Sequence, residues 1–142
     1  MPLILRVVVA VSLMVDAAVH LRLAPGYQQS APSGIGTGNL FRIQAVLALV
    51  VAAWVLWRGS RPALISAFAV SLSAVVAVVL YRYVDIPALG PLPAMYEPVW
   101  FLEKSLSAIF EGLAALAALI ALVVGSRPRA NNERRALHRQ QG

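Results

Sequence analysis

Two groups of polar residues interrupt otherwise apolar stretches of this 142-residue chain. Asp16 and His20 are four residues apart, and the same spacing separates Glu103 from Ser107 and Ser107 from Glu111. Residues four apart lie on one face of a helix. An ionisable side chain near the middle of a bilayer costs at least about 2.5–3.5 kcal/mol on insertion scales, which makes it a candidate functional residue. Such groups can take up a proton, hold a cation or hydrogen-bond a small polar ligand.

Arg42 and Gln44 are predicted to extend this site from a neighbouring segment. The predicted ligand or proton site therefore consists of Asp16, His20, Arg42, Gln44, Glu103, Ser107 and Glu111. One imidazole with carboxylates also suits Zn or Fe, so His20, Asp16, Glu103 and Glu111 are candidate metal ligands. The alternative is structural: Asp16 or Glu111 forms a buried ion pair with Arg42 or His20, or is protonated in place. Arg42 and Lys104 alternatively reach lipid headgroups.

The cofactor is left open by the sequence, but two cofactors are not expected. The chain has no Cys, which excludes thiolate ligands for an iron–sulfur cluster, a disulfide scaffold and a Cys nucleophile. Haem held between two histidines is not expected, because His138 lies in the tail, on the side opposite His20. No catalytic set of nucleophile, base and orienting group is found.

The composition indicates an integral membrane protein. Hydrophobic residues make up 60% of the chain and charged residues 13%, about half the charged share of a soluble domain. Four stretches are long and apolar enough to span a bilayer, at about 3–23, 40–57, 63–84 and 99–124. Pro25 and Gly26 are expected to end the first stretch, which we interpret as a retained span rather than a cleaved signal.

The arginines predict the orientation. Arg58 and Arg61 occupy the turn between the second and third stretches, and five more arginines follow residue 125, whereas segments 24–39 and 85–98 contain no Lys or Arg. By the positive-inside rule both termini should be cytoplasmic, in a bacterial plasma membrane. The net charge of +6 is thus explained without nucleic-acid binding. The intramembrane polar residues then gather in the outer half.

The predicted fold is all-α: an antiparallel bundle of four transmembrane helices over residues 1–125, followed by a basic, mobile cytoplasmic tail at 126–142. The turn at 58–62 makes the second and third helices neighbours. Gly112 and Ala114 are expected to permit close helix approach beside Glu111. Tyr81 and Tyr83 are expected to belong to an interfacial aromatic belt.

Three short motifs carry a resemblance to known proteins. They are AAVHLRL at 17–23, LFRIQA at 40–45 and IFEG at 109–112. Over residues 1–125 the chain resembles small four-helix membrane proteins of actinobacteria, and its architecture is more distantly similar to that of DoxX-like proteins. This resemblance implies a bacterial four-helix membrane protein and carries no activity with it.

Two functions from different classes follow from these observations. In the first, an outward-facing pocket binds or relays a proton, a cation or a small polar ligand. In the second, the chain is an accessory subunit or assembly factor whose polar residues hold helices together. A membrane enzyme ranks third, because no nucleophile or cofactor ligand set is found. The expected partners are the lipid bilayer and either further copies of the chain or a larger membrane complex.

Overall fold

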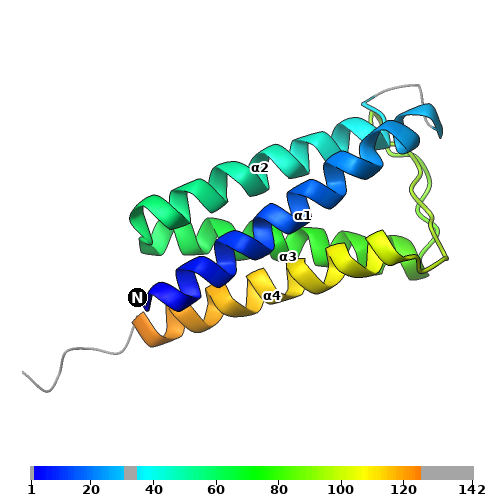
Figure 1. Cartoon of the computed structure of the whole chain (residues 1–142). Coiled ribbons are helices and arrows are strands. Elements are labelled where there is room, and N and C mark those ends of the chain that lie inside the picture. The colour runs from blue at the N-terminus through cyan, green and yellow to red at the C-terminus, as the bar shows by residue number, and fades with distance from the viewer. Residues whose placement is uncertain (1, 31–34, 126–142) are drawn as a thin grey trace, which may run out of the picture.

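The computed structural model describes residues 2–30 and 35–125, and this part of the chain is all-α (Figure 1). Its four helices are α1 (Leu3–Ser30), α2 (Thr37–Arg58), α3 (Arg61–Tyr83) and α4 (Leu102–Gly125). They contain 22 to 28 residues, or about 33–42 Å at 1.5 Å per residue, and each is long and apolar enough to cross a membrane. The prediction of four membrane-spanning helices is confirmed to that extent. The predicted tail at 126–142 lies outside the described residues.

The boundaries of three helices differ from the prediction by three residues or more, and α2 begins at Thr37 rather than at about 40. Pro25 was expected to end the first helix, yet α1 continues to Ser30 with Pro25 inside it. A helical proline lacks the N–H that would bond four residues back. Its cost is outweighed here by contacts of the last turns, where the Tyr27 ring packs 4.8 Å from the Phe41 ring. At the other end, α4 begins at Leu102 rather than 99, with the backbone N–H of Ser105 donating to the Phe101 carbonyl.

The turn between α2 and α3 follows from its residue types. Gly59 ends α2 in the left-handed conformation, at φ 54° and ψ 29°, where glycine carries no steric penalty. Pro62 lies in the first turn of α3, where its fixed φ suits a helix start. Arg6 of α1 closes this end by donating to the carbonyls of Val55 and Leu56.

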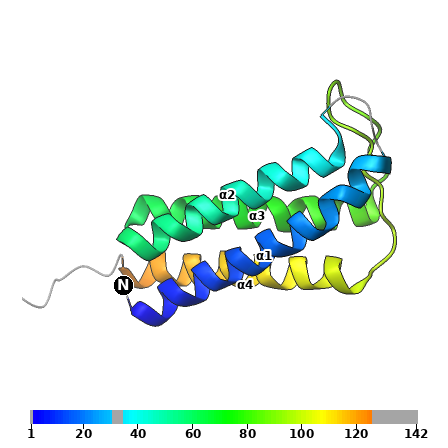
Figure 2. The same cartoon turned by 45° about the horizontal axis from the view of Figure 1, so that its top comes forward.

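Each helix packs against two neighbours in the order α1, α2, α3, α4, because α1 contacts α2 and α4 while α3 contacts the same two helices. Figures 1 and 2 show the α2–α3 turn at the same end of the bundle as the start of α1 and the finish of α4. The finish of α1, the start of α2 and the connection from α3 to α4 lie at the opposite end, called the loop end below.

The core is built largely from alanine, with valine and leucine. Ala48, Ala63, Ala67, Ala114 and Ala118 are completely buried, whereas large aliphatic side chains point outward, as suits a bundle surrounded by lipid. Small side chains let helices approach closely, so that van der Waals contacts can hold them together where the hydrophobic effect does not. The core therefore joins all four helices along the half of the bundle away from the loop end.

The glycine that permits close helix approach is not the one predicted. A Cβ atom at Gly112 would meet no atom of residues 2–30 or 35–125 within 4 Å, so Gly112 faces open space. A Cβ atom at Gly38 would lie 2.3 Å from the Ala24 carbonyl and 2.7 Å from Gln28 Cβ. The tight contact is therefore between α1 and the first turn of α2, at the loop end.

The connection from α3 to α4 crosses the loop end in an extended conformation (Figure 2). It turns back on itself at Gly90, whose φ is 58°, through a pair of backbone hydrogen bonds between Leu89 and Leu92. It is tied to the rest of the bundle by the Glu97 N–H, which donates to the Tyr81 carbonyl, and by the Ile35 N–H, which donates to the Pro91 carbonyl.

Candidate functional site

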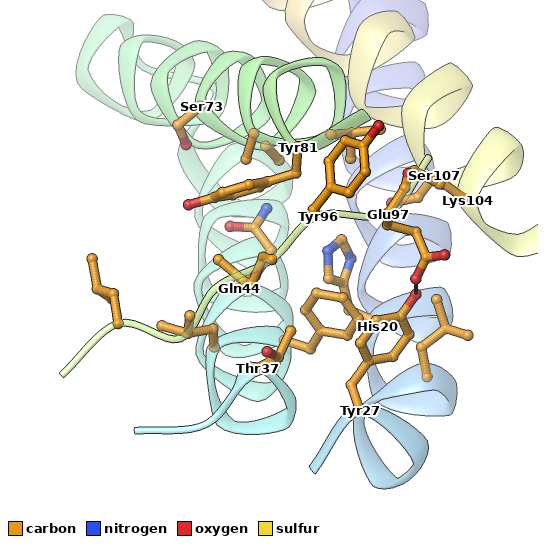
Figure 3. Close-up of a pocket in the computed structure, with 18 of the residues that line it drawn as sticks. His20, Tyr27, Thr37, Gln44, Ser73, Tyr81, Tyr96, Glu97, Lys104 and Ser107 are labelled. Carbon is orange, nitrogen blue, oxygen red and sulfur yellow. Dashed lines mark hydrogen bonds between the residues drawn. The ribbon is translucent and has the colours of Figure 1, made fainter. Parts of the chain in front are cut away.

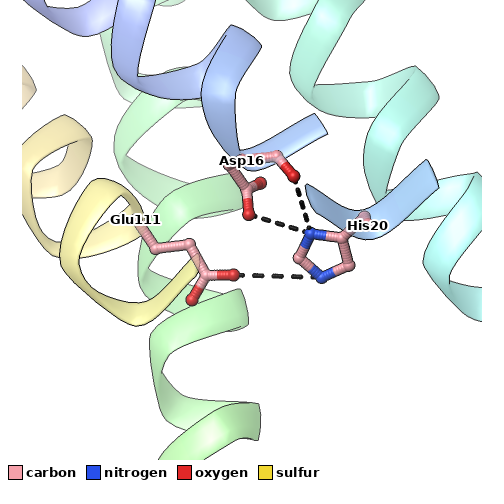
Figure 4. Close-up of side chains that lie close together, drawn as sticks. All are labelled: Asp16, His20 and Glu111. Atoms are coloured by element: carbon pink, nitrogen blue, oxygen red, sulfur yellow. Dashed lines mark hydrogen bonds and ion pairs between the residues drawn. The ribbon is translucent and has the colours of Figure 1, made fainter. Parts of the chain in front are cut away.

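Four polar side chains from α1 and α4 meet inside the bundle, and we call Asp16, His20, Ser107 and Glu111 the polar cluster. Asp16 and Glu111 are each 1% exposed, Ser107 is 4% exposed and His20 is 8% exposed. His20 Nδ1 lies 2.9 Å from Asp16 Oδ1, and His20 Nε2 lies 3.9 Å from Glu111 Oε1 (Figure 4). Helical spacing places each pair on one face, and the packing of α1 against α4 brings the two faces together.

Ser107 links the two carboxyl groups of the polar cluster. Its Oγ lies 2.9 Å from Asp16 Oδ1 and 2.8 Å from Glu111 Oε1. A hydroxyl carries a single proton, so it donates to one of these oxygens and can only accept from the other. Two ionised carboxylates so close together in a buried site repel each other. Uptake of one more positive charge, either a proton or a cation, would reduce this repulsion.

Of the other predicted site residues, Gln44 reaches the polar cluster and two do not. Gln44 Nε2 on α2 donates to Asp16 Oδ2 over 3.4 Å. Arg42 turns away and donates to Asn39 Oδ1 over 2.6 Å. Glu103 lies 4.0 Å from Arg22 at the surface, with 30% of its side chain exposed. The basic partner of Asp16 and Glu111 among the described residues is thus His20 rather than Arg42.

A cavity of about 530 Å³ lies between the polar cluster and the loop end (Figure 3). His20, Gln44 and Ser107 contribute to its lining, so one side of the polar cluster faces this space. Most of its remaining wall is apolar or aromatic, including Phe41 and Tyr81. Tyr81, for which a place in the aromatic belt was predicted, lines the cavity.

Three residues that line the cavity were not predicted as site residues: Tyr27, Glu97 and Lys104. The Tyr27 hydroxyl donates to Glu97 Oε2 over 2.8 Å. Lys104 is 8% exposed, and its Nζ donates to the backbone carbonyl of Glu97. Glu97 is in the extended connection, 70 residues from Tyr27, and no periodic spacing in the sequence relates the two. These bonds hold the connection over the cavity.

The donor set of the polar cluster also suits a metal ion. One ligand atom each from Asp16, His20 and Glu111 lies within 4.8 Å of the other two, and all three residues are buried. The fourth predicted metal ligand, Glu103, does not belong to this group.

The chain matches no known family model, and comparisons with curated proteins and with solved structures found no similar protein. The resemblance to small actinobacterial four-helix proteins therefore stays a prediction, and the site has to be interpreted from its own geometry.

Proposed function

We propose that this chain is a small multi-pass membrane protein whose cavity, open toward the outer face, brings a proton, a cation or a small polar ligand to the polar cluster. One observation carries this proposal. Two buried carboxyl groups lie in hydrogen-bonding distance of one serine hydroxyl, which cannot donate to both, and the His20 imidazole lies 2.9 Å from one of these carboxyls, that of Asp16. A buried site of this kind gains free energy by taking up one more positive charge.

The proposed setting is the bacterial plasma membrane, with the four helices antiparallel and both termini cytoplasmic. Arg58 and Arg61 support it, since both lie at the end of the bundle formed by the α2–α3 turn. By the positive-inside rule that end is cytoplasmic. The loop end, which carries the cavity and contains no Lys or Arg in segment 85–98, then faces outward.

Infrared spectroscopy of the chelator-washed protein in lipid nanodiscs tests the proton-binding form of this function. A protonated carboxyl group gives a C=O band that shifts when its proton exchanges with D₂O. We expect such a band to exchange readily through the cavity and to be lost in Glu111→Gln. Glu103→Gln is the matched control, because Glu103 lies at the surface outside the polar cluster.

Native mass spectrometry from mild detergent tests for a bound ligand and separates the two functional classes. A discrete extra mass that disappears in Glu111→Gln supports binding and identifies the ligand class. The accessory-subunit alternative is favoured by the Ser107–Asp16 hydrogen bond, which joins α4 to α1. That alternative predicts a stoichiometric second protein and no extra mass. If the wild-type chain shows neither an exchangeable carboxyl band nor an extra mass, the binding function is wrong.

A further inference from the structure

The contact between His20 Nε2 and Glu111 Oε1 spans 3.9 Å. This distance is too long for a hydrogen bond, although both side chains are buried and face each other across the α1–α4 interface (Figure 4). Two ligands about 2.1 Å from an ion with tetrahedral geometry lie roughly 3.4 Å apart. An inward movement of roughly 0.5 Å would therefore give the two atoms the spacing of metal ligands.

The orientation of His20 is fixed from its other ring nitrogen. Nδ1 lies 2.9 Å from Asp16 Oδ1 and 3.1 Å from the Asp16 carbonyl oxygen, so this nitrogen is the natural position of the ring proton. In a neutral imidazole Nε2 then carries a lone pair, and it is directed at Glu111. Histidines that bind metal ions commonly donate their other N–H to a carboxylate in this way.

Asp16 and Glu111 differ in how their oxygens are used. Both Asp16 oxygens have partners, with Gln44 at Oδ2 and with His20 and Ser107 at Oδ1. Glu111 Oε1 lies 2.8 Å from the Ser107 hydroxyl, but Glu111 Oε2 is buried and has no hydrogen-bond partner among the described residues. A buried carboxylate oxygen without a partner is costly, and a cation would satisfy it.

Charge balance favours a divalent ion. The two carboxylates together carry two negative charges when ionised, and no Lys or Arg of the described residues lies within ion-pair distance of either. A divalent cation with neutral His20 makes the buried site neutral overall. The imidazole favours ions such as Zn²⁺ over Mg²⁺ and Ca²⁺, which prefer oxygen ligands.

We propose that the polar cluster binds one divalent transition-metal ion of the Zn²⁺ type between His20 Nε2 and the Glu111 carboxylate. Asp16 is a positioning residue that holds the imidazole and supplies the second negative charge. Because His20 lines the cavity, water from that side completes the coordination. Any proton on Glu111 or on Nε2 leaves to water as the ion binds. This inference rests on the proposed function and names the cation.

The test uses the full chain in nanodiscs with His138→Ala, so that His20 is the single histidine. The protein is stripped with a chelator, dialysed against Zn²⁺ with excess Mg²⁺, and assayed for metal by mass spectrometry. We expect one zinc ion per chain, lost in Glu111→Gln and retained in Glu103→Gln. Asp16→Asn should weaken zinc binding by about 10–100-fold, the usual effect of losing a residue that orients a metal-bound histidine.

A second measurement is independent of whether Glu111→Gln folds. X-ray absorption at the zinc edge of the His138→Ala chain should show one imidazole nitrogen among oxygen ligands. Absence of stoichiometric zinc, zinc retention unchanged in a folded Glu111→Gln chain, or a spectrum without imidazole would overturn the metal site. If zinc fails to bind while the exchangeable carboxyl band is present, only the metal inference is wrong and the proposed function stands.

Discussion

Two buried serines allow the role of the polar cluster in the fold to be measured. Ser107 is 4% exposed and Ser71 is 1% exposed, and both lie within helices of the bundle. Ser107 contacts a carboxyl oxygen on α1 and another on its own helix, whereas Ser71 Oγ has no hydrogen-bond partner in the described part of the chain. Replacing each serine by alanine removes the same atom from a similarly buried position.

The expected magnitudes differ because of those contacts. Hydrogen bonds between membrane helices contribute about 0.6 kcal/mol on average and up to about 1.7 kcal/mol. Ser107→Ala removes the hydroxyl from both Asp16 Oδ1 and Glu111 Oε1, so it should lower the free energy of unfolding by about 1–3 kcal/mol. Ser71→Ala removes a buried hydroxyl that has no partner, so stability should be unchanged or rise by up to about 1 kcal/mol.

Reversible unfolding by SDS titration in mixed micelles, followed by circular dichroism, gives both free energies. Ser105→Ala is a further control, because the Ser105 hydroxyl bonds only the Phe101 carbonyl of its own segment among the described residues. Equal losses in Ser107→Ala and Ser71→Ala would refute the reasoning, since they would show that the hydroxyl contacts at Ser107 do not stabilise the bundle.

Three further predictions concern other contacts of the bundle. Gly38→Ala should lower the free energy of unfolding, measured by thermal unfolding, by about 1–3 kcal/mol, because the new Cβ atom collides with α1. Gly112→Ala should raise it by about 0.5–1 kcal/mol, because alanine favours the helix and its Cβ atom points into open space. Equal effects of the two variants would contradict the packing described. Arg6→Gln removes a cation from the C-terminal carbonyls of α2 and should cost about 0.3–1 kcal/mol in the same assay, and an unchanged midpoint would argue against this contact. Tyr27→Phe removes the hydrogen bond to Glu97 and should raise amide hydrogen exchange in segment 84–101 roughly tenfold; unchanged exchange would show that this bond does not hold the segment.

The sequence predicts the helices well because their signal is local. Hydropathy over about 20 residues is enough to identify each span, and the Gly59 and Pro62 signals mark the α2–α3 turn correctly. The end of α1 is predicted wrongly, because the penalty at Pro25 is local while the compensating contacts of Tyr27 come from Phe41 and segment 84–101. Tertiary contacts of this kind leave no periodic pattern in the sequence.

Helix geometry explains which predicted site residues meet. A spacing of four falls 40° beyond a whole turn at about 3.6 residues per turn, so Glu103, eight residues before Glu111, lies about 80° around α4 from it. Arg42 is two residues from Gln44 and faces away from it, as residues two apart do on a helix. Ser107 and Glu111 lie beside Asp16 because of the orientation of α4 about its own axis relative to α1. This orientation depends on packing and could not be predicted from residue spacing alone.

The two halves of the bundle differ in packing, and this difference bears on how the proposed ligand would reach the polar cluster. Beyond Glu111, away from the cavity, the described core is mostly apolar and rich in alanine: Ala114, Ala118 and Ala121 are at most 2% exposed, and Ser12 is a buried polar residue there. Alanine contacts of this kind bring helices close together, and their side chains offer no hydrogen-bonding partner to a hydrated ion. A ligand that enters past His20 would have to separate these helices to leave at the other end. The geometry therefore favours a site that is filled and emptied through the cavity over a continuous path across the membrane.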